Sequence, residues 1–104
     1  MLTKKSQERA APVFYLQDEL TIYRAAELKL LLLGTPRPLN LDLSGVTELD
    51  SAGVQLLMQA KKMALQHQES FQLQAPSAAV SEVLALLNLQ NYFEVILAGV
   101  THES

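Results

Sequence analysis

The sequence predicts a single α/β domain with a mixed sheet of four to five strands, in the order β-β-α-β-α-β-α-β, and helices packed mainly on one face. About half of the 104 residues (49%) are hydrophobic, which is enough for one core. Short β-patterned segments alternate with helical segments of about 10–15 residues, and this order is typical of parallel strands joined by crossover helices.

The first half of the chain predicts a hairpin followed by a helix. Residues 13–16 (VFYL) and 20–23 (LTIY) are rich in β-branched and aromatic side chains, and the polar residues 17–19 (QDE) between them suit a turn. Residues 25–33 are strong helix formers, and Gly34 follows as the C-cap. We therefore expect an antiparallel hairpin at the edge of the sheet, followed by a helix.

The second half predicts three strands and two helices. Residues 39–43 (LNLDL) and 71–75 (FQLQA) alternate apolar and polar side chains, and residues 92–97 (YFEVIL) resemble a last strand. A long amphipathic helix spans about residues 51–66, with Val54, Leu57, Met58, Lys61 and Leu65 on one stripe. A further helix runs from an N-cap at Ser77 through Leu89.

Length and composition bound the class of protein. Residues 12–100 are expected to form the domain, between a flexible tail at residues 1–11 and a short tail at residues 101–104. Eight Lys and Arg against eleven Asp and Glu give a net charge of −3, which argues against a nucleic-acid partner. Residues 1–11 lack the apolar region of a signal peptide, and no apolar run approaches membrane-spanning length. We expect a cytoplasmic protein without direct membrane insertion.

The sequence lacks the residue patterns of self-contained catalysis. It has no cysteine, and neither His67 nor His102 has a carboxylate cluster at metal-ligand spacing. The four glycines are too far apart for a phosphate-binding loop, and no nucleophile elbow is present. We therefore expect a protein that is not an enzyme, with no catalytic residue, no cofactor and no metal.

The informative stretch is residues 41–60, LDLSGVTELDSAGVQLLMQA. Asp50 or Ser51 stands where a helix N-cap is expected. Gly53 falls in the first turn of that helix, where glycine costs about 1 kcal/mol relative to alanine. Its presence indicates that another backbone, a partner or a ligand comes close to this turn.

This stretch and the order of elements resemble the STAS domain family of sulphate transporters and anti-sigma factor antagonists. The regulatory members carry Asp, then Ser or Thr, then a small residue, then Gly, and Asp50, Ser51, Ala52 and Gly53 match that motif. The resemblance implies that Ser51 is the phosphoacceptor. Ala52 stands where many sporulation-type antagonists have a second serine, and Gln55 replaces a small residue of several of them.

The resemblance implies a bacterial signalling protein that regulates transcription by partner switching. It would bind a kinase-type anti-sigma factor or related signalling kinase while Ser51 is unphosphorylated, and a Ser/Thr phosphatase would remove the phosphate. In this interpretation the unmodified Ser51 caps the helix, and the phosphate adds about −1.5 to −2 charge beside Asp50. The alternative is an accessory subunit of a bacterial phospholipid-transport ABC complex, which has a small STAS subunit with a similar motif.

Five further residues are candidates for the partner-binding surface. Gln55, Gln59 and Lys62 form a polar stripe on the helix that begins at Ser51, which a solvated face would explain equally. Tyr23 and Arg24 border the same edge if the strand before them lies beside residues 39–43, although a tyrosine at a strand end also serves packing. Exposed leucines of the following helix, Leu86 and Leu89, would allow a weak homodimer.

Overall fold

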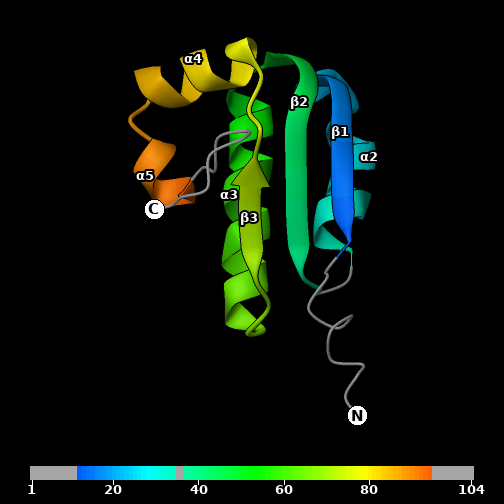
Figure 1. The fold of residues 1–104 in the computed structure, drawn as a ribbon. Coiled ribbons are helices and arrows are strands. Elements are labelled where there is room, and N and C mark those ends of the chain that lie inside the picture. Colours follow the sequence, from blue (N-terminus) through cyan, green and yellow to red (C-terminus); the bar gives the residue numbers. More distant parts are fainter. Residues whose placement is uncertain (1–11, 35–36, 95–104) are drawn as a thin grey trace.

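The computed structural model of the chain describes residues 12–34 and 37–94. Its elements in chain order are β1 (Val13–Leu20), the 3-10 helix η1 (Ile22–Arg24), α2 (Ala25–Leu33), β2 (Leu39–Leu49), α3 (Ser51–Gln66), β3 (Phe71–Gln74), α4 (Ala78–Leu86) and α5 (Gln90–Phe93). Figure 1 shows α2 and α3 behind the sheet and α4 across the end at which the strands finish. The predicted α/β class is confirmed.

The sheet has the order β1-β2-β3, and both pairs of strands are parallel. Phe14, Leu41 and Leu73 are aligned across the three strands, and the two leucines are fully buried. The neighbouring aligned set is Tyr15, Asp42 and Gln74, which face the other side of the sheet because side chains alternate along a strand. Among the described residues the sheet therefore has three parallel strands rather than a mixed set of four or five.

The predicted N-terminal hairpin is wrong, because residues 13–20 form one continuous strand. Its register against β2 shifts between Tyr15 and Gln17 and again between Asp18 and Glu19. Asp18 has φ 63°, a left-handed conformation that aspartate tolerates better than most residues. The polar segment that predicted a turn is thus a β-bulge, and the chain after it enters η1 instead of a second strand.

The C-terminal part also differs from the prediction. α4 begins after the predicted N-cap Ser77, whose side chain accepts a hydrogen bond from the Val80 N–H (3.2 Å), but it ends at Leu86 rather than at residue 89. Tyr92 and Phe93 belong to α5 instead of a strand, and residues 95–97 lie outside the described residues. Phe93 is 1% exposed and its ring lies 6.2 Å from that of Phe71, so a short helix buries the aromatic side chain.

The long helix α3 spans the predicted residues but buries a wider face. Val54 and Leu57 are buried as expected, and Leu56 is buried as well. Leu65 is 56% exposed, and Lys61 donates a hydrogen bond to the Tyr92 carbonyl. The reason is that α3 contacts α2 and all three strands, so its core-facing side is not a single stripe.

Candidate functional site

Two segments that are distant in the sequence meet at the carboxyl ends of β1 and β2. Parallel strands end at the same edge of a sheet, so the end of β1 at Leu20 lies beside the end of β2 at Leu49. The Asp50 N–H donates to the Leu20 carbonyl at 3.2 Å. The start of α3 is therefore fixed directly beside the start of η1.

Asp50 joins these two segments through its side chain. One carboxylate oxygen, Oδ1, accepts from the Gly53 N–H at 3.0 Å, which makes Asp50 the N-cap of α3. The other, Oδ2, accepts from the Ile22 N–H at 3.1 Å. The Gly53 N–H above all, and then the Ile22 N–H, hold the pKa of Asp50 below its usual value, against the opposing effect of partial burial.

Gly53 is required by the backbone of β1. A Cβ at this position would lie 2.2 Å from the Leu20 carbonyl oxygen and 2.8 Å from Cδ1 of Leu49. The sequence left open whether a backbone, a partner or a ligand approaches this glycine, and the structure identifies the backbone of Leu20. Gly53 therefore permits the junction of strand and helix rather than the binding of a ligand.

Ser51 is exposed at the first residue of α3. Asp50 occupies the N-cap, so the interpretation in which the unmodified Ser51 caps the helix is wrong. Asp50 supplies the cap because the residue before the first helical residue has the extended backbone that directs its side chain to the first turn. Ala52 is half-buried. The Ser51 hydroxyl therefore does not cap the helix.

Tyr23 lies in η1 and is 88% exposed. The turn below it is well ordered by hydrogen bonds: Thr21 is buried, its hydroxyl donates to Glu19 Oε1 at 2.6 Å, and it accepts from the Tyr23 N–H at 3.3 Å. Ile22, which sequence reasoning missed, is 60% exposed. Its only sequence signal was an apolar side chain, which strand alternation would have directed into the core.

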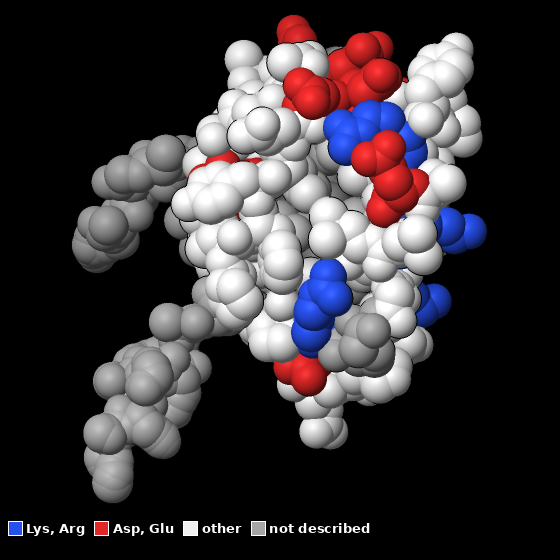
Figure 2. All heavy atoms as spheres, turned by 90° about the vertical axis from the view of Figure 1, so that its right-hand side faces the viewer, with Lys and Arg blue, Asp and Glu red and all other residues white. Residues whose placement is uncertain are grey.

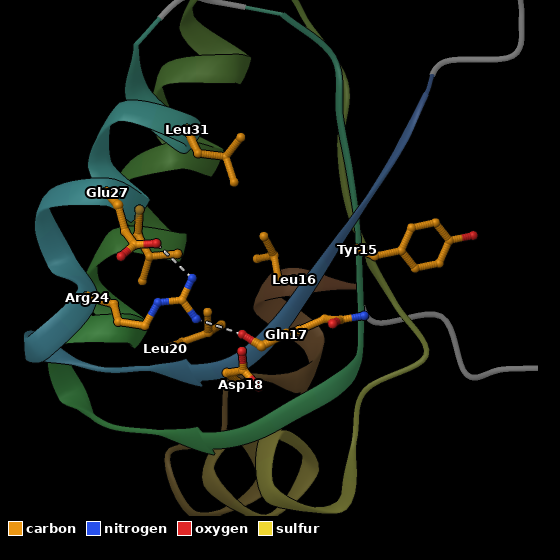
Figure 3. Close-up of a pocket in the computed structure, with 9 residues that line it drawn as sticks. Tyr15, Leu16, Gln17, Asp18, Leu20, Arg24, Glu27 and Leu31 are labelled. Carbon is orange, nitrogen blue, oxygen red and sulfur yellow. Dashed lines mark hydrogen bonds and ion pairs between the residues drawn. The ribbon is translucent and has the colours of Figure 1, made fainter.

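The Arg24 side chain is held at the bulged end of β1 by hydrogen bonds. Its Nη1 donates to the carbonyls of Gln17 (2.8 Å) and Glu19 (3.2 Å), and its Nη2 pairs with Glu27 Oε2 at 2.9 Å. The hydrogen bond to Glu27 is the main reason that the pKa of Arg24 is raised. Arg24 lines a cavity of about 230 Å³ together with Leu16 and Leu31. Figure 3 shows its guanidinium between Glu27 and the backbone of Gln17. Arg24 borders the site but already has three partners.

Gln55, Gln59 and Lys62 are all exposed on α3, as the polar stripe predicted. Gln55 lies one turn beyond Ser51, whereas Gln59 and Lys62 lie about 12 and 17 Å along the helix axis. The structure therefore brings Tyr23, Ser51 and Gln55 to one end of the molecule and leaves Gln59 and Lys62 farther away. We call Ile22, Tyr23, Ser51 and Gln55 the η1–α3 surface.

Among residues 12–34 and 37–94 no group of three or more His, Asp or Glu side chains is placed to hold a metal ion. None of the helices there is both long enough and apolar enough to cross a bilayer.

Comparison with known proteins identifies relatives of this fold. The family model described as "Mlab, STAS domain" matches residues 3–98. Among solved structures, the chain is similar to that of a candidate anti-sigma factor antagonist from Thermotoga maritima. The two chains are 26% identical with a TM-score of 0.68, and the match covers 82% of this chain and 77% of that chain. No curated protein matches the sequence. With a family model that spans nearly its whole length, the chain belongs to the STAS domain family.

Proposed function

We propose that the protein is a phosphorylation-controlled regulator that acts as an anti-sigma factor antagonist. In its unphosphorylated form it binds a kinase-type anti-sigma factor through the η1–α3 surface, and phosphorylation of Ser51 by that kinase releases it. A separate Ser/Thr phosphatase restores the binding form. The observation that carries the proposal is the exposed Ser51, free of any capping role, at the start of α3, which is bonded to the segment that carries the exposed Tyr23.

The local chemistry supports an effect of phosphate on binding. A phosphate on Ser51 adds about −1.5 to −2 charge next to the Asp50 carboxylate, whose pKa is already low. The N–H groups of Gly53 and Ile22 are bonded to Asp50 and do not compensate the new charge. A partner that fits the neutral serine would bury this charge, and a penalty of about 2–3 kcal/mol weakens binding roughly 30- to 150-fold.

The protein acts by binding rather than by catalysis in this proposal. Its place of action is the cytoplasm, where kinase, phosphatase and sigma factor are available, and its output is a change in transcription. Similarity to a candidate anti-sigma factor antagonist from Thermotoga maritima supports this choice among STAS functions.

A second candidate is the accessory subunit of a bacterial phospholipid-transport ABC complex. The small STAS subunit of such complexes has a motif similar to residues 50–53 of this chain, and the matching family model is a STAS domain. Such a subunit would bind the nucleotide-binding subunit of the transporter, whatever the state of Ser51.

The experiment that separates the two candidates combines mass spectrometry with binding measurements. Protein isolated from native cells is analysed for phosphate on Ser51, and the captured partner is identified and purified. Affinity is then measured for the wild type, Ser51→Ala, Ser51→Glu and, as the matched control, Ser70→Glu at an exposed serine just before β3. We expect Ser51→Ala to bind and Ser51→Glu to bind more weakly, with Ser70→Glu unchanged. Absence of phosphate together with equal affinities would refute the switch.

A further inference from the structure

We propose that the partner of this chain presents an apolar pocket for Tyr23 and Ile22 that is ringed by Lys and Arg side chains. The inference rests on the proposed function only in taking the η1–α3 surface as a protein-binding surface. It adds the chemistry of the partner, which neither the motif nor the fold specifies.

The apolar part of the argument is the exposure of two side chains on a firmly held turn. Ile22 is 60% and Tyr23 is 88% exposed. Their backbone is held by the Ile22 N–H bond to Asp50, the Tyr23 N–H bond to Thr21, and the Arg24 N–H bond to the Thr21 carbonyl (2.9 Å). A large aromatic side chain presented on a fixed backbone is typical of an interface anchor, because little conformational entropy is lost when it is buried.

The second part of the argument is the charge around this turn. Contacts and strand register bring five carboxylates to the edge, and Figure 2 shows acidic side chains gathered there; they are Asp18, Glu19, Glu27, Glu48 and Asp50. Glu19 and Glu48 are direct cross-strand neighbours. Arg24 is the one cation among the residues joined by these contacts, and Glu27 pairs with it. Five carboxylates against one guanidinium give this edge alone a more negative net charge than the whole chain, whose net charge is −3.

The charge selects among possible occupants of the surface. Anionic lipids and nucleic acids would be repelled. A second copy of the chain, docked symmetrically, would bring two acidic edges together, since the same patch meets itself in a two-fold dimer. A protein with a basic rim would be attracted over several ångströms and would then bury Tyr23. A basic protein surface is the occupant that the charge favours.

The test uses a phage-displayed library of random peptides, selected on the full-length chain. We expect the selected peptides to be rich in Lys and Arg together with apolar residues. Tyr23→Ala and Glu48→Lys should each weaken their binding about tenfold, and the wild-type affinity should fall as salt is raised. The matched controls are Leu86→Ala and Glu82→Lys, which change an exposed leucine and an exposed carboxylate on α4. They should leave binding unchanged, and circular dichroism checks that every variant is folded.

Other outcomes would overturn the inference. Selected peptides that are acidic or uncharged, binding that ignores salt, or equal losses in the α4 controls would each contradict a basic partner. The same peptides are also tested on Ser51→Glu. Loss of binding only in Tyr23→Ala and Glu48→Lys supports the inference while counting against the switch. Loss only in Ser51→Glu contradicts the inference and leaves the switch supported.

Discussion

The starts of α3 and α4 are built from the same elements but do different things. Each helix follows a strand of the sheet, and each begins with a side chain that accepts from the third helical N–H, Asp50 from Gly53 and Ser77 from Val80. Ser77 makes a local cap, and its own N–H donates to Leu43. The Asp50 carboxylate has a second oxygen, which reaches Ile22, 28 residues away in the sequence.

The third position of each helix shows the same contrast. Val80 is fully buried in the core and fills space there. At the corresponding place in α3, Gly53 leaves room for the Leu20 carbonyl. Both helix starts are bonded to a strand end through a backbone N–H, Asp50 to Leu20 and Ser77 to Leu43. Only the start of α3 adds a side-chain bond to a distant segment, from Ile22 to the Asp50 carboxylate, and is a junction in that sense. A site that displays residues of two segments together has to be built at such a junction.

The largest effect is expected for Gly53→Ala. Its Cβ would meet the Leu20 carbonyl oxygen at 2.2 Å, so α3 and β1 would have to separate. We expect a loss of about 3 kcal/mol in the free energy of unfolding, measured by urea denaturation. The matched control is Gly45→Ala, where the nearest atoms belong to the flexible side chain of Gln17 at 3.1 Å and the change should stay within about 1 kcal/mol. Similar losses in both variants would contradict the junction.

A smaller effect is expected when the two caps are removed. Asp50→Ala loses the cap and the bond to Ile22, and we expect about 2–3 kcal/mol. Ser77→Ala loses a cap alone, for which about 1 kcal/mol is typical. Equal losses in urea denaturation would mean that the Asp50–Ile22 bond adds nothing. Amide hydrogen exchange at Ile22 provides a second measurement, and it should speed up in Asp50→Ala only.

The pH dependence of the junction follows from the lowered pKa of Asp50. Its stabilising effect is present above the pKa of aspartate in the unfolded chain, about 3.9, and is lost as the pH falls through the lower pKa of the folded protein. Asp50→Asn keeps a capping side chain without the charge. The difference in unfolding free energy between wild type and Asp50→Asn should therefore shrink between about pH 5 and pH 2. A difference that grows with acidity would show that the carboxylate does not act as an anion here.

The smallest effect on stability is expected for Ser51→Ala. Because Asp50 and not Ser51 caps α3, the unfolding free energy should change by less than about 0.5 kcal/mol. Thermal and urea denaturation of Ser51→Ala and Ser77→Ala, measured in parallel, compare the contributions of the two serines to stability. A loss above about 1 kcal/mol would mean that the Ser51 hydroxyl has a structural role.

Much of the helical structure followed from local patterns. The bounds of α2 and α3 agree with the predicted ranges, and Ser77 is the cap that the sequence indicated. These features depend on propensity, periodicity and capping, which act within a few residues of each other. The same reasoning placed Gln55, Gln59 and Lys62 on a polar stripe of α3, and all three are exposed.

The errors arose where two local interpretations were equally good. Residues 17–19 suit both a turn and a bulge, and the choice depends on whether β1 continues along β2. Residues 92–93 suit both a strand and a helical turn, and the position of Phe93 against Phe71 decides. Neither choice is encoded within the segment itself.

The sequence by itself determined the α/β class, the bounds of the helices α2 and α3, and the motif that contains Ser51. Only the tertiary structure decided that the Asp50 carboxylate also accepts from Ile22 and that Gly53 accommodates Leu20. Helix propensity and capping preferences act locally, whereas these contacts need the parallel pairing of β1 with β2 to bring their carboxyl ends together. A motif therefore identifies the residues of such a site, and the packing of the strands determines which neighbours they have.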